Sequence, residues 1–183
     1  MHVGELLSTP ERQRILRRIL YSPTGASLRK LASEADVSPS QVHKYFSILK
    51  KGNLMTRAAK LKDSALLRTL RLLENLAFLA DAKVAGAVLS SLSGVEGIGL
   101  YGSWSKGTND EKADIDFWVL VGREPKDLEL GKLRRELQEK TGKTIDLTVL
   151  TFKKFGDLKV RNPTFYYALL NSLTLWGNDL WSV

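Results

Sequence analysis

Apolar residues recur at helical spacing through the first half of the chain. The segment ERQRILRRILYS places Ile15, Leu16, Ile19 and Leu20 on one face, with arginines around them, and predicts an amphipathic helix. Residues 63–92 are apolar at helical spacing almost throughout and predict two consecutive helices. Packing in the core of one chain is the commoner explanation of such apolar helix surfaces. The alternative is that they form the contact between two copies of the chain in a homodimer.

The second half has shorter apolar runs, separated by polar turns. The runs predict strands over residues 97–101, 114–121, 143–151 and 173–176, and helices over residues 127–140 and 163–171. Alternation of this kind indicates an α/β sheet covered by helices.

Residues 27–53, SLRKLASEADVSPSQVHKYFSILKKGN, predict two short helices joined by the tight turn ADVS. Ser38 is the expected N-cap of the second helix, Pro39 its first residue, and Gln41 completes a capping box. Gly52 supplies the stop. The residues expected to face inward from this helix are Val42, Tyr45 or Phe46, and Leu49.

The net charge of +8 lies entirely in the first part of the 183-residue chain. Residues 1–80 hold 14 Lys+Arg and 6 Asp+Glu, a balance of +8, whereas residues 81–183 hold 14 of each. A local excess of positive charge is typical of a polyanion binder, although solvated basic helices give the same count. The change near residue 80 also predicts two functional units.

Composition excludes several classes of site. The chain has no cysteine, which removes disulfides, thiolate zinc sites and cysteine nucleophiles, and its two histidines are too few for a histidine metal cluster. No run reads as a signal peptide or a membrane span. The expected protein is cytoplasmic and makes no contact with a membrane.

Residues 11–60 resemble the winged helix-turn-helix family, with LASEADVSPSQVHKYFSIL as the core of the resemblance. The family implies that the helix from Pro39 enters the major groove of double-stranded DNA and that residues 54–62 form a strand and a wing. The expected nucleic-acid contacts are Ser40, Gln41, His43 and Lys44 from the helix, and Arg57, Lys60 and Lys62 from the wing. The alternative is a helix-turn-helix that serves only in packing or dimerisation.

The stretch GSWSKGTNDEKADIDFWVLV, residues 102–121, carries the candidate chemistry. Side chains two apart on a strand share a face, so Asp114 and Asp116 form a pair of carboxylates that repel each other. A divalent cation removes that repulsion, and oxygen ligands suit Mg²⁺ or Mn²⁺. Asp146, in the otherwise apolar run KTIDLTVL, adds a third carboxylate if the two strands are neighbours.

Glycine and serine precede this acidic pair. Gly102 allows a close approach of the backbone to a ligand, and Ser103 offers a hydroxyl group beside N–H groups that favour an anion. Lys106 and Gly107 stand in the wrong order for a P-loop. These residues predict a nucleoside triphosphate bound together with a metal ion.

Residues 81–183 resemble the minimal nucleotidyltransferases of the DNA polymerase beta superfamily, through Gly102-Ser103, Gly107, Asp114-Ile115-Asp116 and Asp146. The family implies that Asp114 and Asp116 bind two metal ions, that Ser103 holds a phosphate, and that Asp146 binds one metal ion and helps activate the acceptor hydroxyl. Gly102, Lys106 and Gly107 complete the expected nucleotide site.

Two positions depart from the family pattern. Lys106 stands where arginine is common, so the charge is kept and the bidentate fork is absent. Ala113 replaces a common serine and removes one hydrogen bond. Trp104 is expected to cover the loop rather than to stack on a base.

The predicted organisation is a winged helix-turn-helix over residues 1–62, a helical linker over 63–80 and a polymerase-beta-like nucleotidyltransferase domain over 81–183, an α+β or α/β chain with a mixed sheet flanked by helices. The predicted activity is Mg²⁺-dependent transfer of a nucleoside monophosphate, with ATP as the expected donor, to an unidentified acceptor. One alternative is a DNA-binding transcriptional regulator whose transferase domain binds nucleotide without turnover. Another is a toxin–antitoxin protein that modifies or binds a partner protein.

Overall fold

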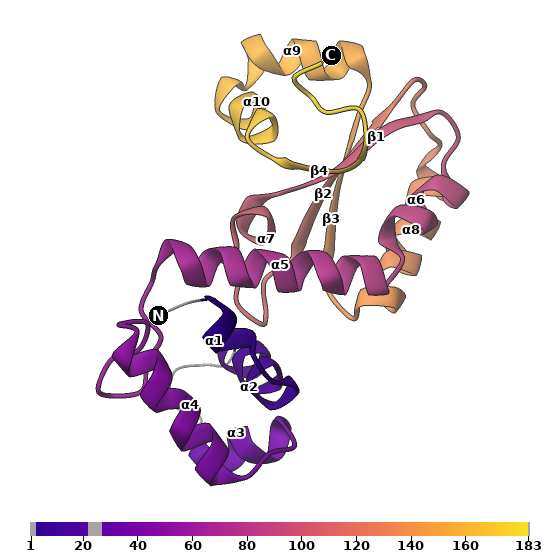
Figure 1. The fold of residues 1–183 in the computed structure, drawn as a ribbon. Helices are drawn as coiled ribbons and strands as arrows, with labels where there is room; N and C mark the ends of the chain where they lie inside the picture. The colour runs from indigo at the N-terminus through magenta and orange to yellow at the C-terminus, as the bar shows by residue number, and fades with distance from the viewer. Residues whose placement is uncertain (1–2, 22–26, 183) are drawn as a thin grey trace. The chain divides into compact units, whose positions relative to one another are not determined.

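The computed structural model describes residues 3–21 and 27–182 and divides the chain into two compact units, Met1–Glu74 and Asn75–Val183 (Figure 1). Helix α5 (Ala65–Asp81) begins in the first unit and ends in the second, so residues 65–80 of the expected linker belong to one continuous helix. Although α5 has 17 residues, no helix in the described ranges is both long and apolar enough to cross a membrane.

The first unit is helical. Its helices are α1 (Val3–Leu7), α2 (Pro10–Tyr21), α3 (Leu28–Glu34), α4 (Pro39–Lys51) and the start of α5. The apolar stripe predicted on α2 is buried, and all four inward candidates of α4 join the same core, including both Tyr45 and Phe46. The apolar surface at the start of α5 also packs there, through Leu67 and Leu70, which confirms core packing for this part of the helix.

The predicted start of α4 is confirmed in detail. The Ser38 hydroxyl accepts the Gln41 backbone N–H at 3.2 Å, and the Gln41 amide oxygen accepts the Ser38 N–H at 2.8 Å. Gly52 ends the helix as predicted, but its φ is −76°, and the left-handed conformation is taken by the next residue, Asn53, with a φ of 59°. Asparagine tolerates this conformation better than most side chains.

After α4, the chain makes a tight turn where a strand and a wing are expected. A single isolated bridge joins Met55 to Leu61, and the Thr56 backbone N–H donates to the Lys60 carbonyl at 2.8 Å. Ala59 has a φ of 59°, which turns the chain within these few residues. The Lys62 backbone N–H donates to the Leu54 carbonyl at 2.9 Å on the other side of the bridge, so the two segments pair as a short hairpin. The expected strand is therefore only one bridge long, and the wing stays a prediction.

The second unit is built on a mixed four-stranded sheet. Its elements are α6 (Val84–Ser91), β1 (Val95–Tyr101), α7 (Gly102–Lys106), β2 (Ile115–Val121), α8 (Asp127–Thr141), β3 (Ile145–Leu150), α9 (Phe152–Arg161), α10 (Pro163–Leu170) and β4 (Leu173–Gly177). The strand order is β3-β2-β1-β4, with β2 and β3 parallel and β1 antiparallel to both of its neighbours. All the predicted strands and helices of this half are present, and the mixed sheet flanked by helices is confirmed.

Helix α9 was not predicted, whereas Gly102 was expected to stand at the end of a strand and the start of a helix, which is confirmed. The short helix α7 follows β1 directly, within the glycine-serine stretch. Helix α9 lies in FKKFGDLKVR, where Gly156 interrupts the sequence, yet Thr151 caps it by accepting the Lys154 backbone N–H at 3.2 Å. The threonine cap and the spacing of Phe155 and Leu158 are the signals that indicate this helix.

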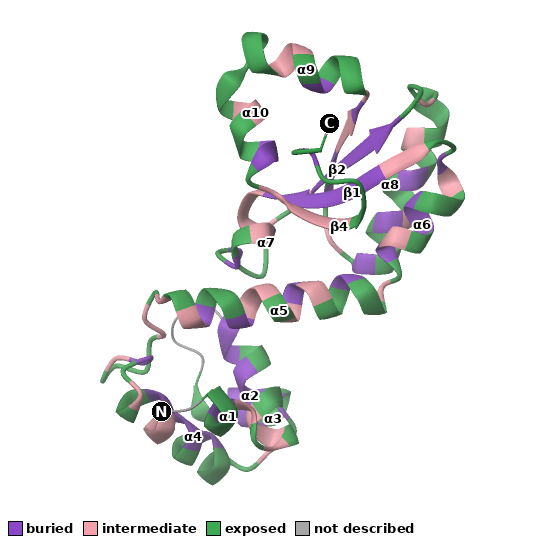
Figure 2. Cartoon of the chain, turned by 45° about the horizontal axis from the view of Figure 1, so that its top comes forward, coloured by how far each residue is buried: buried purple, intermediate pink, exposed green. Residues whose placement is uncertain are grey.

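The two faces of the sheet have different covers. Ile115, Phe117 and Val119 of β2 point into a core with α6 and α8, which pack together (Figures 1 and 2). Trp118 and Leu120 point to the other face, where α9 and α10 lie. The alternation expected along β2 is therefore present, and Asp116 shares the second face with Trp118.

Candidate active site

The strand register brings three polar side chains into one row across the sheet. Asp116 pairs with Tyr101 of β1 on one side and with Asp146 of β3 on the other. Register partners on adjacent strands point to the same face, so the two carboxylates are neighbours. The expectation that the strands of Asp116 and Asp146 lie side by side is confirmed.

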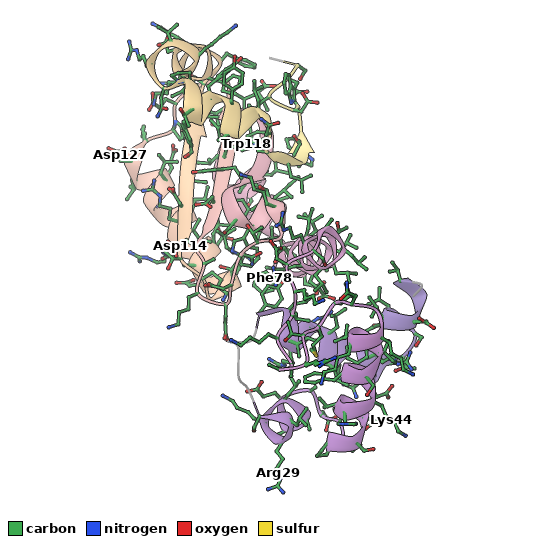
Figure 3. The ribbon with its side chains drawn as sticks, turned by 90° about the vertical axis from the view of Figure 1, so that its left-hand side faces the viewer. Arg29, Lys44, Phe78, Asp114, Trp118 and Asp127 are labelled. Carbon is green, nitrogen blue, oxygen red and sulfur yellow. The ribbon has the colours of Figure 1, made fainter. Side chains whose placement is uncertain are left out.

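Asp116 is only partly accessible, and its surroundings disfavour its charge. Burial raises the pKa of its carboxyl, and the nearby charges of Asp146 and Asp114 raise it further. Asp114 lies one residue before β2 and is exposed (Figure 3). Asp116 is therefore the carboxyl that senses both of the others, and it is the least exposed of the three.

The position of the Asp116 side chain requires glycine at residue 102. Gly102 has a φ of +68°, and a Cβ atom there would lie 2.0 Å from the Asp116 Oδ2 atom. The sequence suggested a ligand as the group that approaches this glycine, whereas in the structure the approaching group is the carboxylate itself. The first residue of α7 and the acidic strand are thus fitted to each other.

Tyr101 belongs to the site, although no sequence pattern pointed to it. Its hydroxyl donates to Asp146 Oδ2 at 3.3 Å and lies 3.0 Å from the Thr148 hydroxyl, so its side chain extends from β1 past the intervening β2. Its ring packs edge-on against Phe165 of α10, with ring centroids 5.7 Å apart. Burial raises the pKa of the Tyr101 hydroxyl to about 12, so it stays a donor near neutral pH.

The expected nucleotide-binding residues lie on α7. Ser103 is partly accessible, Lys106 is exposed at the end of the helix, and Gly107 ends it with a φ of +62°. Trp104 is 4% exposed and donates its indole N–H to the Ala113 carbonyl at 3.3 Å. The expectation that Trp104 covers the loop is confirmed, because its ring is buried.

Two residues that were not predicted to take part in the site join the loop between α7 and β2 to helix α5. Asn75 and Asn109 are buried and exchange amide hydrogen bonds. A buried asparagine within an apolar helical run was the available signal, because a buried amide group needs a partner.

These carboxylates have the chemistry to hold a divalent cation, since Mg²⁺ and Mn²⁺ prefer oxygen ligands. Two carboxylates in direct register, one with a raised pKa, fit a bound cation that would relieve their repulsion. As arranged in residues 3–21 and 27–182, no three acidic or histidine side chains converge closely enough to form a complete metal cluster.

The first unit holds the residues expected to contact nucleic acid. Ser40, Gln41, His43, Lys44, Arg57 and Lys60 are exposed, and Lys62 is partly buried. The amide oxygen of Gln41 is engaged in the capping box, and the Lys62 ammonium donates to the Asn53 side chain. Of the seven, Gln41 and Lys62 therefore have the least freedom to meet a nucleic acid.

Many arginines of the first unit are engaged within it. Arg14 and Arg18 of α2 donate to carbonyls at the end of α3, and Arg17 pairs with Glu74 at 2.6 Å. In the described part of this unit, the cationic side chains that make no ion pair or hydrogen bond are Arg29, Lys44, Lys50, Lys51, Arg57 and Lys60. We call these six residues the basic surface, and Figure 3 shows Arg29 and Lys44 extending away from the ribbon.

Comparison with known proteins bears on the second unit. Residues 83–170, slightly under half of the chain, match the family model described as a nucleotidyltransferase domain. No curated protein matches the chain.

Solved structures show weaker likeness. A crystal structure of a mutant of the toxin-antitoxin MntA-HpeT is 21% identical with a TM-score of 0.42, covering 52% of this chain and 71% of that one. A candidate nucleotidyltransferase from Sulfolobus solfataricus is 16% identical with a TM-score of 0.39, covering 64% and 91%. The range that matches the family model includes Gly102, Ser103 and all three aspartates, so the similarity to nucleotidyltransferase domains extends over the candidate site.

Proposed function

We propose that this chain is a cytoplasmic, divalent-metal-dependent nucleotidyltransferase that transfers a nucleoside monophosphate from a nucleoside triphosphate, with ATP as the expected donor, to an acceptor hydroxyl. A bond forms between the acceptor oxygen and the α-phosphorus, the bond from that phosphorus to the bridging oxygen breaks, and pyrophosphate leaves. The observation that carries the proposal is the direct register of Asp116 with Asp146, beside Asp114, within the family match.

Each residue has a defined role in this proposal. Asp114, Asp116 and Asp146 hold Mg²⁺ or Mn²⁺, which when bound stabilises negative charge on the attacking and leaving oxygens. Ser103 donates a hydrogen bond to a phosphate, and exposed Lys106 supplies positive charge to the triphosphate. Asp146, whose carboxylate accepts a hydrogen bond from the Tyr101 hydroxyl, has the proposed role of assisting removal of the acceptor proton.

Transfer of label from an α-labelled triphosphate tests the proposal. The wild-type chain with Mg²⁺ and candidate acceptors should release pyrophosphate and label the acceptor, and the double variant Asp114→Asn with Asp116→Asn should lose at least a hundredfold in rate. Asp127→Asn is the matched control, because Asp127 is an exposed carboxylate separated from Asp114 by the length of β2 (Figure 3). Equal activity of the double variant and the control would contradict the site assignment.

The basic surface supports a second candidate function, double-stranded DNA binding by the first unit. Its cations are exposed and unpaired on α3, α4 and the turn after α4, and so can neutralise phosphates without first breaking internal ion pairs. In this candidate the chain is a DNA-binding regulator, with or without turnover in the transferase domain. A toxin–antitoxin protein partner and a homodimer stay predictions.

The salt dependence of DNA affinity tests this second candidate. Alanine at Lys44, Arg57 and Lys60 should flatten the slope of log affinity against log salt by about one for each phosphate that is no longer neutralised. Alanine at three α8 cations, Lys132, Arg135 and Lys140, removes the same charge from the second unit and should leave the slope unchanged. Absence of DNA affinity in the wild-type chain at low salt would favour a packing role for the first unit.

A further inference from the structure

A buried pair of amide side chains lies behind the candidate site. Asn75, on α5, is 0% exposed, and Asn109, in the loop between α7 and β2, is 3% exposed. The Asn75 Nδ2 atom donates to Asn109 Oδ1 at 2.9 Å, and Asn109 Nδ2 donates to Asn75 Oδ1 at 3.3 Å. Reciprocal amide bonds in a buried setting fix the orientation of both side chains, since breaking either would leave polar groups unpaired.

The same helix holds the loop at a second point. Asn75 Nδ2 also donates to the Trp104 carbonyl of α7 at 2.9 Å. One turn further along α5, Phe78 packs against the Trp104 ring, with ring centroids 5.8 Å apart. The Trp104 indole N–H in turn donates to the carbonyl of Ala113, the residue before Asp114. Both ends of the loop are therefore tied to α5.

The other attachments of the loop are made at its exposed residues. The Thr108 backbone N–H and hydroxyl donate to the Ser103 carbonyl at 3.0 and 3.4 Å, and the Lys143 ammonium donates to the Glu111 carbonyl. Thr108 and the stretch 110–112 are exposed, so Asn109 is the buried side chain among residues 108–112. The loop connects α7, where the phosphate-binding residues are expected, to Asp114 at the start of the acidic strand. Its position determines how far apart these two groups lie.

We propose that Asn75 and Asn109 are positioning residues for nucleotidyl transfer, holding the loop so that α7 and Asp114 act on one bound triphosphate. This proposal rests on the proposed function for its catalytic consequence, although the holding of the loop can be measured without activity. Asn75 acts through Asn109 and Trp104, and it touches no reacting atom.

The design of the variants uses the asymmetry of buried hydrogen bonds. Replacing Asn75 removes the amide partner of buried Asn109, whereas replacing both by apolar groups of similar shape can be nearly neutral for stability. Leucine has a branched shape like that of asparagine. Asn75→Leu alone should therefore lower the melting temperature, and Asn75→Leu with Asn109→Leu should recover part of the decrease while the link to the loop stays broken.

Ser172→Ala is the matched control. The Ser172 hydroxyl accepts the indole N–H of buried Trp118 at 2.7 Å, so this change also removes the partner of a buried donor in the same unit. It leaves the loop attachments intact. Any effect of reduced stability alone should appear in this variant too.

Two measurements on the full chain test the proposal. Hydrogen exchange of the amides of residues 102–113 should be at least tenfold faster in the double leucine variant than in the wild type or in Ser172→Ala, with the interior of β2 unchanged. The kcat for nucleotidyl transfer should fall by about ten- to a hundredfold, which is the scale expected when reacting groups are misplaced by about 1 Å. This fall in kcat should be larger than any rise in KM.

The outcomes separate the two proposals. Unchanged exchange of the loop in the folded double variant would overturn the holding role, whatever the activity. Faster exchange with unchanged kcat would overturn the catalytic role. If the wild-type chain transfers no nucleotide, the proposed function fails, and the exchange measurement still decides whether the pair holds the loop.

Discussion

The aspartates of the second unit and the basic surface of the first differ in what surrounds them. Asp116 is partly buried, faces two other carboxylates and is fitted against Gly102, while Asp146 accepts the Tyr101 hydroxyl. The cations of the basic surface, such as Lys44 and Arg57, are exposed and make no ion pair or hydrogen bond within the described part of the first unit.

This difference determines how much each region says about function. Like charges held together at the end of a sheet reduce stability, so their presence points to a role that requires them. Exposed cations have little effect on stability and occur on many surfaces, so they indicate a polyanion partner only through their number and distribution. The acidic site is thus the more specific signal.

The largest expected effect comes from adding one methyl group to the acidic site. Gly102→Ala forces a left-handed conformation on alanine and a contact with Asp116, so it should lower the free energy of unfolding by about 2 kcal/mol or more and abolish transfer. Chemical denaturation measures the first effect. Gly131→Ala, in the exposed interior of α8 with open space at its Cβ, should instead raise stability by about 0.5–1 kcal/mol. Similar changes in stability in Gly102→Ala and Gly131→Ala would contradict the expected difference between the acidic site and an exposed helix.

The second prediction concerns the charge of Asp116. Because its folded pKa is raised, the folded state binds more protons than the unfolded state between the two pKa values, and wild-type stability falls as pH rises through that window. Asp116→Asn should therefore melt at a higher temperature than the wild type at pH 7, and the difference should vanish at acid pH. Thermal melts across pH measure it. A less stable variant at pH 7 would show that the carboxylate is favourably paired.

Divalent cations should reverse the difference in stability between the wild type and Asp116→Asn. Mg²⁺ at ten times its dissociation constant should stabilise the wild type by about 1.4 kcal/mol and should raise the melting temperature of Asp116→Asn far less. Equal Mg²⁺ shifts in the two proteins would place the ion elsewhere.

A smaller effect is expected from the Tyr101 hydroxyl. Tyr101→Phe removes the hydrogen bonds to Asp146 and Thr148 and should lower the free energy of unfolding by about 1 kcal/mol. It should also weaken Mg²⁺ binding, because Asp146 loses the donor that orients it. Titration with Mg²⁺, followed by the melting temperature, tests the second part. Unaltered Mg²⁺ dependence would limit Tyr101 to a structural role.

The smallest effects should come from the basic surface. Alanine at Lys44, Lys50 or Lys51 should change the free energy of unfolding by no more than about 0.5 kcal/mol, because these side chains are exposed and unpaired. Denaturant titration of each variant measures this. A decrease well above that value would show that the surface has a structural role.

Much of the fold could be read from local patterns. Capping residues and periodicity predict α4 and the buried stripe of α2, and alternation along β2 separates Phe117 from Asp116. The length of the pairing after α4 could not be read in this way, because the apolar pattern does not show that the chain turns back at Ala59 and leaves a single bridge between Met55 and Leu61.

The sequence by itself determined which carboxylates, glycines and cations are present and which of them share a strand or a helix, because these depend on near neighbours along the chain. Only the tertiary structure decided that Asp146 pairs with Asp116, that Tyr101 extends past β2 to Asp146, and that Asn75 holds the loop before Asp114. These contacts join residues 30 or more apart in sequence, or across strands whose order no local pattern fixes. Strand order and side-chain burial are set by packing of the whole unit, so they become known only when it is folded.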